Sequence, residues 1–181
     1  MRIVGGRHRG LKLAELGRGD NRAHLRPTPD RVRESLFSIL ASRGWLDGAQ
    51  VLDLFAGTGA LGLEALSRGA ARATFVESGR VGLRLIANNL ARAGRTGDAT
   101  VIARDARKLG PGTPHDLVFL DPPYGQNLGA SVLAACLKNG WIAPDALIVW
   151  EENARQDPPA GFAPDDHRQY GDTHVTVLTV A

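Results

Sequence analysis

The segment Asp121-Pro122-Pro123-Tyr124 contains the residues of this chain that are best suited to bind a planar ring carrying an amine. It follows the apolar run 117–120, which predicts a position at the end of a buried strand. Asp121 and the Pro122 carbonyl can accept hydrogen bonds from an exocyclic NH2 group, because the prolines fix φ and remove backbone donors. The Tyr124 ring offers a face on which an unstacked base can lie. Taken alone, the segment is equally compatible with a proline-rich turn.

A glycine-rich loop upstream, residues 53–59 (Asp-Leu-Phe-Ala-Gly-Thr-Gly), favours a ligand site. A short apolar strand precedes the loop and a helical stretch follows it, a geometry that lets a nucleotide-like ligand approach the backbone. Residues 57–62 also satisfy the G-x-G-x-x-G pattern, so a nicotinamide or flavin enzyme is a competing interpretation. Asp53 argues against it, since a carboxylate there would face the two phosphates of a dinucleotide. It suits instead the ammonium group of S-adenosylmethionine.

Acidic residues follow the next strands as well. Glu77 is placed for two ribose hydroxyls, and Asp105 could accept from an adenine amino group while the Ala106 N–H meets a ring nitrogen. Alone, Asp105 is more typical of a helix N-cap. With Asp53 and Asp121, however, the chain has one carboxylate at the carboxyl end of each of four strands, the edge where open α/β sheets bind ligands. The expected cofactor contacts are Asp53, Phe55, Ala56, Gly57, Thr58, Gly59, Glu77, Ser78, Asp105 and Ala106.

The two motifs together resemble the class I S-adenosylmethionine-dependent methyltransferases that methylate exocyclic amines. Four further blocks narrow the resemblance to the bacterial RsmD family of 16S ribosomal RNA guanine-N2 methyltransferases: residues 1–10, 25–37, 61–70 and 170–173. The resemblance covers nearly the whole chain, and its N-terminal blocks are more specific than the superfamily motifs. Residues 17–24 match no pattern, and residues 125–127, Gly-Gln-Asn, are short and uncharged for a substrate loop.

This resemblance implies methylation of the N2 amine of a guanine in small-subunit ribosomal RNA, with the four residues 121–124 as the catalytic set. It also implies S-adenosylmethionine as methyl donor, S-adenosylhomocysteine as product, and no metal. The implied substrate is ribosomal RNA in a partly assembled small subunit. The chemistry would depend on positioning: hydrogen bonds from the NH2 group to Asp121 and Pro122 hold the nitrogen and favour a nucleophilic geometry. Either Asp121 or water takes the proton.

Three alternatives remain open from the residues. A DNA adenine methyltransferase uses a similar slot, but the chain has no room for a DNA-reading domain. A protein-glutamine methyltransferase usually has Asn in place of Asp121 and a separate N-terminal domain. A noncatalytic RNA-binding protein could have kept the fold, although the intact Asp53, Glu77, Asp121 and Tyr124 weigh against it.

Composition predicts a single globular domain. The chain has 181 residues, with 43% hydrophobic and 23% charged. It has no apolar run of membrane length and a polar N-terminus without signal-peptide character, so we expect a cytoplasmic monomer that does not contact membrane. The single cysteine, Cys136, is expected in the core, and the five dispersed histidines show no metal spacing. We expect an N-terminal arm and connector over 1–24 and a methyltransferase domain over 25–181.

Positive charge is concentrated at the N-terminus. Residues 1–33 carry nine Lys and Arg against three acids, whereas residues 145–181 carry seven acids against two arginines. Such asymmetry indicates a polyanionic partner along one edge, and arginine suits phosphates and bases better than lysine. A merely solvated surface is the alternative. The candidate RNA contacts are Arg2, Arg7, Arg9, Arg26 and Arg31.

The hydrophobic pattern predicts a Rossmann-like α/β fold, with a mostly parallel sheet covered on both faces. Expected strands lie near 50–54, 72–77, 99–104, 115–120 and 146–150, and expected helices near 60–68, 79–93 and 128–139.

The two ends of the chain are expected to add further elements. A basic hairpin pairs 2–5 with 11–14 and carries residues 7–9 at its tip, and an antiparallel hairpin closes the chain over 168–170 and 174–180. A first helix is expected to run to about Arg43, with Thr28 as N-cap, Pro29 at its first position, and the charges Arg31, Arg33 and Glu34 off its buried face. Glu151 and Glu152 are expected in solvent.

Overall fold

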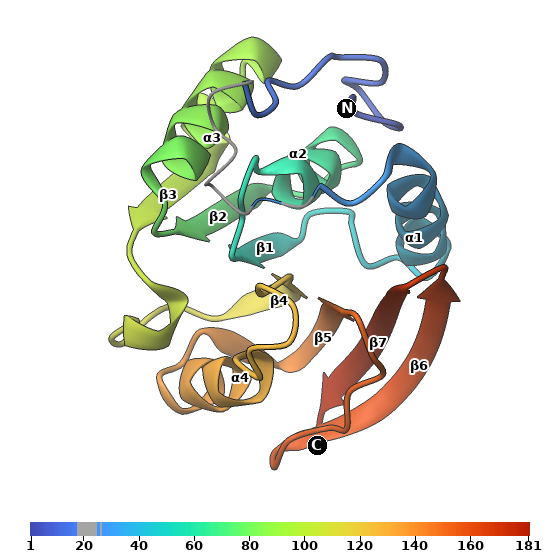
Figure 1. Ribbon diagram of the computed structural model, residues 1–181, viewed down its shortest axis with the longest axis vertical. Helices are drawn as coiled ribbons and strands as arrows, with labels where there is room; N and C mark the ends of the chain where they lie inside the picture. The colour runs from blue at the N-terminus through green and yellow to red at the C-terminus, as the bar shows by residue number, and fades with distance from the viewer. Residues whose placement is uncertain (18–24, 26) are drawn as a thin grey trace.

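The computed structural model describes residues 1–17, 25 and 27–181 of the chain. A seven-stranded sheet forms the centre, in the order β3-β2-β1-β4-β5-β7-β6 (Figure 1). The first five strands run parallel, and β7 and β6 are antiparallel additions at one edge. The strands are β1 (Gln50–Leu54), β2 (Arg72–Glu77), β3 (Ala99–Ala103), β4 (His115–Leu120), β5 (Ile142–Glu152), β6 (Phe162–Tyr170) and β7 (Thr173–Val180). The Rossmann-like fold predicted from the sequence, with its closing hairpin, is confirmed.

Helices cover both faces of the sheet, as Figure 1 shows. On one face lie α1 (Asp30–Ser42), α2 (Ala60–Ser67) and α3 (Arg80–Ala93); on the other lie α4 (Gly129–Lys138) and the 3₁₀ turn η2 (Ala106–Lys108). A second 3₁₀ turn, η1 (Thr96–Asp98), precedes β3. Alternate residues of β4 divide between the two faces: Leu117 and Phe119 join the α1–α3 core, and Val118 and Leu120 join the α4 core. This period-two division of an almost wholly apolar strand is what a sheet buried on both sides requires.

Helix α2 is buried on every side, because the N-terminal segment covers the part that the sheet does not. That segment folds back on itself through a bridge between Arg2 and Lys12, and its tip is held where Arg7 N donates to Ser67 O at 2.8 Å. Gly6 has a φ of +75°, and a Cβ there would lie 2.0 Å from the Ser67 carbonyl oxygen. The expected N-terminal hairpin is therefore present, but it is packed against α2.

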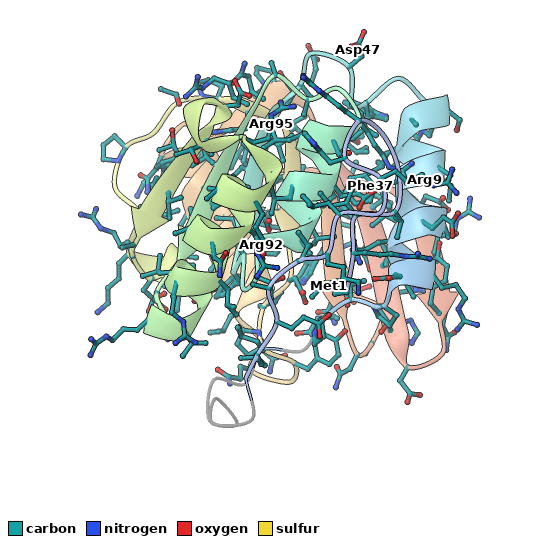
Figure 2. The ribbon with its side chains drawn as sticks, turned by 90° about the horizontal axis from the view of Figure 1, so that it is seen from above. Met1, Arg9, Phe37, Asp47, Arg92 and Arg95 are labelled. Carbon is teal, nitrogen blue, oxygen red and sulfur yellow. The ribbon has the colours of Figure 1, made fainter. Side chains whose placement is uncertain are left out.

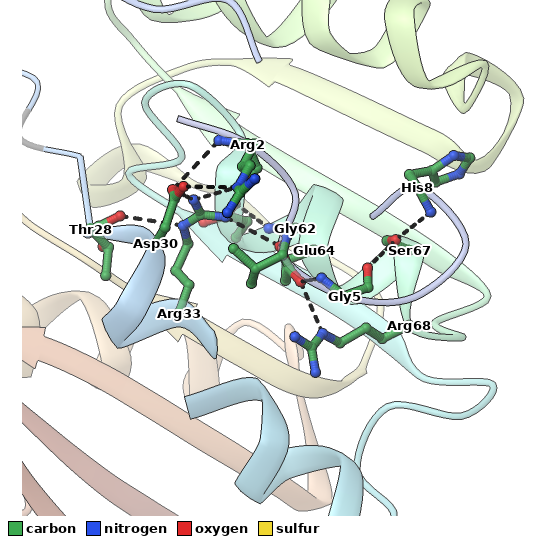
Figure 3. Close-up of polar contacts among 12 residues, drawn as sticks. Arg2, Gly5, His8, Thr28, Asp30, Arg33, Gly62, Glu64, Ser67 and Arg68 are labelled. Atoms are coloured by element: carbon green, nitrogen blue, oxygen red, sulfur yellow. Dashed lines mark hydrogen bonds and ion pairs between the residues drawn. The ribbon is translucent and has the colours of Figure 1, made fainter. Parts of the chain in front are cut away.

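A buried ion cluster fastens this segment to the body (Figure 3). The Glu64 side chain, on α2, accepts from Val4 N at 3.0 Å and Gly5 N at 2.8 Å. It is also paired with Arg33 of α1 at 3.2 Å and Arg68 at 2.9 Å, and both Glu64 and Arg33 are fully buried. The cluster joins the N-terminal segment, α1 and α2 through one carboxylate.

Three expectations about charged and polar residues are wrong. Arg33 does not lie off the buried face of α1, since Glu64, Asp30 and the Arg2 carbonyl hold it inside. Thr28 is not the N-cap of α1: Pro29 holds that position, and the Thr28 hydroxyl donates to Glu151 at 2.8 Å instead.

The third error concerns the acids at the end of β5. Glu151 and Glu152 are buried, at 5% and 4% exposure, because β5 continues two residues beyond the expected strand and pairs with β7 there. Cys136 is buried as predicted, and its apolar surroundings raise the pKa of its thiol to about 12. Within residues 1–17, 25 and 27–181, no helix combines the length and the apolar character needed to span a bilayer.

Candidate active site

A cavity of about 650 Å³ opens along the carboxyl ends of the central strands. It brings together the four strand-end acids that the sequence singled out, Asp53, Glu77, Asp105 and Asp121. Their meeting follows from the parallel register, in which Asp53 lies beside Phe75 of β2 and Phe119 of β4. The cavity lining is Leu25, Pro27, Thr28, Asp53, Phe55, Ala56, Gly57, Thr58, Ala60, Leu61, Glu77, Ser78, Gly79, Asp105, Arg107, Asp121, Pro122, Pro123, Tyr124, Gln126 and Leu128.

Asp53 lies at the floor of the cavity, almost wholly buried at 1% exposure. Its Oδ2 accepts a hydrogen bond from Gly62 N, 2.9 Å away in the first turn of α2. Burial raises the pKa of this carboxyl to about 8; the Glu77 charge adds to the rise, and the Gly62 hydrogen bond opposes it. A buried carboxyl of this kind gains most from a cationic ligand group, because the cation compensates the charge that burial disfavours.

Glu77 connects the glycine-rich loop to the start of α3. Its Oε2 accepts from Gly57 N at 2.8 Å and its Oε1 accepts from Gly79 N at 2.7 Å. Phe55, just before Gly57, holds a φ of +58°, a left-handed conformation that is uncommon for a bulky residue and turns the chain sharply out of β1. Strain of this kind is typical of ligand-binding loops.

Asp105 is the N-cap of η2, one of its two sequence interpretations, and its role as a cofactor contact stays a prediction. It caps η2 by accepting from Arg107 N at 2.9 Å, and it lines the cavity. The Arg107 guanidinium also pairs with the Asp105 carboxylate at 2.6 Å and lowers the pKa of that carboxyl. Ala106 packs into the α4 core, and the cavity wall on this side is formed by Asp105 and Arg107.

The segment 121–124 forms the opposite wall. Asp121 N donates to Leu54 O at 3.4 Å, which ties the end of β4 to the loop after β1. The Tyr124 hydroxyl donates to Glu151 at 3.0 Å. Burial, together with the Glu151 charge, raises the pKa of Tyr124, so this phenol stays protonated and donates.

The candidate RNA contacts divide between two places. Arg31 is exposed in the first turn of α1, and Arg2 is exposed beside Asp30, 3.8 Å from its carboxylate. Arg7 and Arg9 are exposed where the N-terminal segment meets the C-terminal end of α2, whereas the cavity lies at the N-terminal end of that helix; Figure 2 labels Arg9. Arg26 lies outside the described residues. All five remain predictions.

The residues that line the cavity differ in part from those predicted from the sequence. Of the expected cofactor contacts, Gly59 and Ala106 do not line the cavity. The lining residues that were not predicted lie next to the motif segments in the sequence. Their closeness to those motifs was the one feature that could have predicted them. The buried Glu151 gave no such signal, since it follows an ordinary apolar strand. The missed lining residues are Leu25, Pro27, Thr28, Ala60, Leu61, Gly79, Arg107, Gln126 and Leu128.

Solved structures with the same architecture define the class of this protein. The Escherichia coli protein yhhF superposes with a TM-score of 0.86 at 40% sequence identity, covering 99% of this chain and 97% of that one. An RNA methyltransferase from Salinibacter ruber, solved in complex with S-adenosyl-L-homocysteine, superposes with a TM-score of 0.68 at 18% identity, covering 86% of this chain and 94% of that one. The fold is that of the class I methyltransferases.

Sequence comparison then gives the family. The model of the family described as conserved hypothetical protein 95 matches residues 1–179. Ribosomal RNA small subunit methyltransferase D of Escherichia coli K12 is 44% identical over 168 residues, 90% of this chain and 81% of its own. The Haemophilus influenzae protein of the same name is 40% identical over 156 residues, 83% of this chain and 78% of its own. This chain belongs to the RsmD family of methyltransferases.

Proposed function

We propose that this chain transfers a methyl group from S-adenosylmethionine to the exocyclic N2 amine of a guanine in small-subunit ribosomal RNA. The carrying observation is the single cavity that holds the four strand-end acids and the Asp-Pro-Pro-Tyr segment. Relatives covering most of the chain are named for methylation of small-subunit ribosomal RNA, which supports the same substrate class here. The N2 position of a guanine is the finer part of the proposal and comes from the family resemblance.

The residues of the cavity fit S-adenosylmethionine. Asp53, a buried carboxyl with a raised pKa, suits the ammonium group of the methionine moiety. Glu77 suits the ribose hydroxyls. Asp105 and Arg107, which form the neighbouring cavity wall, could contact the adenine. Phe55 adds apolar surface between the two acids. When bound, this cofactor supplies a methyl group already activated by a positively charged sulfur.

The chain's own contribution is to hold the acceptor nitrogen. Asp121 and the Pro122 carbonyl accept hydrogen bonds from the NH2 group, fix its position and oppose delocalisation of its lone pair into the ring. The Tyr124 ring stacks on the extruded base, a contribution of about 1–3 kcal/mol. The proton leaves to Asp121 or to water. Because the leaving group is a sulfonium, we propose that the reaction requires no metal.

The proposed setting is a cytoplasmic monomer that acts on a partly assembled small ribosomal subunit. The exposed arginines of the N-terminal segment and of α1 support an RNA partner. The candidate contacts are Arg2, Arg7, Arg9 and Arg31, with Arg26 added from the sequence.

The deciding experiment incubates the purified protein with radiolabelled S-adenosylmethionine and one of four acceptors: small-subunit particles, naked 16S RNA, DNA, or a peptide release factor. We expect label in RNA, retained with a chelator present, and located on the N2 atom of a guanine by nucleoside mass spectrometry. Label in DNA or protein, or in no acceptor, contradicts the proposal.

A further inference from the structure

We propose that Glu151 is a positioning residue that fixes Tyr124 against the turn at Thr28, so that the base-stacking ring is set before RNA arrives. This inference rests on the proposed function, because it assigns Glu151 a part in methyl transfer. Glu151 does not line the cavity, but both of the residues it holds do. It would therefore act through Tyr124 and Thr28 rather than by touching the base.

The geometry gives each oxygen of Glu151 its own hydroxyl donor. Oε1 accepts from the Tyr124 hydroxyl at 3.0 Å, and Oε2 accepts from the Thr28 hydroxyl at 2.8 Å. The two donors come from segments 96 residues apart in the chain, and the carboxylate joins them on one side of the cavity.

The backbone at Glu151 belongs to the interior of the sheet. The residue belongs to β5, which pairs with β4 on one side and β7 on the other, and Glu151 itself lies opposite Val175. Its neighbour Trp150 lies opposite Leu120, the residue just before Asp121. The carboxylate is thus fixed by the same strands that set the position of residues 121–124.

A buried acid at this position needs donors. Removing a carboxylate from water is unfavourable unless hydrogen bonds replace the lost hydration, and Glu151 is only 5% exposed. Hydroxyl groups suit this purpose, since a protonated phenol can donate a charge-assisted hydrogen bond to a carboxylate. The hydrogen bond to Glu151 holds the hydroxyl end of the Tyr124 side chain, while Tyr124 still lines the cavity.

The tether extends to the N-terminal segment. The Thr28 carbonyl accepts from Arg33 Nε at 3.3 Å, and Arg33 Nη2 donates to the Arg2 carbonyl at 2.8 Å (Figure 3). A continuous series of hydrogen bonds therefore runs from the N-terminal segment, through Arg33, Thr28 and Glu151, to Tyr124. Pre-ordering Tyr124 in this way lowers the entropy lost when a base stacks on it.

The first test is kinetic and compares Glu151→Ala, Tyr124→Phe and the double variant, with small-subunit particles as substrate. We expect each single variant to lower kcat/KM for RNA by about five- to tenfold, the effect of losing one hydrogen bond. The losses of the two single variants should add up to more than the loss of the double variant, because the hydrogen bond between Tyr124 and Glu151 is removed in both. The dissociation constant for S-adenosylmethionine should stay within about twofold, since neither side chain is among the proposed cofactor contacts.

Two further variants separate positioning from folding. Glu151→Gln keeps an oxygen acceptor and should recover part of the lost rate. Glu152→Gln is the matched control, since Glu152 is equally buried on the same strand, and among the described residues its side chain accepts from its neighbour Asn153 N at 2.9 Å. It should leave kcat/KM unchanged. Additive single-variant losses, or a loss of cofactor affinity equal to the loss of rate, would overturn the proposal.

A second measurement does not depend on catalysis. The chain has two tyrosines, so a ¹³C-tyrosine label gives two sets of ring signals, and Tyr124→Phe assigns them. Glu151→Ala should shift the Tyr124 ring signals and speed ring flipping, with Tyr170 unchanged. Unchanged Tyr124 signals would refute the role of Glu151 even if methyl transfer is observed. A shift in a protein that methylates no RNA would support the tether and count against the proposed function alone.

Discussion

Two buried carboxylates contact helix α2, and their surroundings differ. Glu64, in the C-terminal half of the helix, is surrounded by donors: two backbone N–H groups and two guanidinium groups. Asp53, at the N-terminal end, accepts from Gly62 N and faces the cavity. Burial raises the pKa of Asp53 to about 8.

This difference separates a structural acid from a ligand-binding one. Glu64 is compensated entirely from within the protein, so its role is complete when the chain has folded. Burial disfavours the charged form of Asp53, and a bound cation would stabilise that form. Burial alone therefore does not indicate function, and the nature of the compensating partners does.

The strongest test of the cavity as a catalytic site is Asp121→Ala. We expect methyl transfer to fall by about 10²–10⁴-fold, because the acceptor amine loses its positioning carboxylate. Affinity for S-adenosylmethionine, measured by calorimetry, should change only a few-fold. Asp116→Ala is the matched control, since Asp116 lies at the opposite end of β4 and accepts from Gln50 N. Near-normal activity in Asp121→Ala would remove residues 121–124 from the mechanism.

For the structural acid, Glu64→Ala should lower the free energy of unfolding by about 3–5 kcal/mol, because Arg33 loses its buried ion pair and the backbone N–H groups of Val4 and Gly5 lose their acceptor. Urea denaturation followed by circular dichroism measures this loss. Glu34→Ala, on the exposed side of α1, should change stability by less than about 0.5 kcal/mol. A Glu64 variant as stable as the wild type would show that the cluster contributes no net stability.

Glu77→Ala should weaken S-adenosylmethionine binding by at least about tenfold. The variant loses a charge-assisted acceptor for the ribose and also frees the loop at Gly57. Calorimetry gives the dissociation constant. The value for Glu77→Gln should lie between those of the wild type and Glu77→Ala. Unchanged affinity in Glu77→Ala would exclude this residue from the cofactor site.

The Asp53 pKa makes cofactor binding depend on pH. Below about pH 8 the buried carboxyl holds its proton, and an ammonium ligand must displace it. Affinity should therefore rise with pH below about 8, by less than about tenfold per pH unit, and fall again where the ammonium group of the ligand loses its own proton. Asp53→Asn should bind more weakly and without this rise. Calorimetry in buffers of different ionisation enthalpy should detect proton release on binding to the wild type; its absence would contradict the assignment.

The smallest expected effect is that of Arg7→Ala with Arg9→Ala. Removing one arginine–phosphate interaction should reduce the slope of log affinity against log salt by about 0.7–0.9, with a few-fold loss of RNA affinity. The modified nucleotide should stay the same, because these residues lie away from the cavity. Arg168→Ala, on the acidic C-terminal hairpin, is the control. If the methylated position moved while affinity held, the N-terminal segment would be reading RNA sequence or shape.

The sequence predicted the fold and the cavity edge because their signals are local. Each acid of the set lies within two residues of the carboxyl end of its own strand, and parallel strands align such ends without further information. The expected strand 72–77 matches β2 to the residue, and the expected helix 79–93 differs from α3 by one.

The errors fall where a partner is distant in sequence. Arg33 pairs with Glu64, 31 residues away, and Thr28 with Glu151, 123 residues away. Periodicity predicted that Arg33 lies off the buried face of α1, because a pattern within one helix cannot show that Glu64 of α2 pairs with this arginine. Thr28 before Pro29 fits the sequence pattern of an N-cap, but its hydroxyl donates to the distant Glu151 instead.

The capture of the N-terminal backbone by α2 also sets an order of events during synthesis. Val4 and Gly5 leave the ribosome about 60 residues before Glu64, to which both donate. At ordinary elongation rates of about 5–20 residues per second, Glu64 is synthesised roughly 3–12 s after the N-terminal segment that it binds. During that interval its polar backbone and the apolar Ile3 are exposed to other chains, so the packing of the first thirteen residues depends on a helix that is translated later.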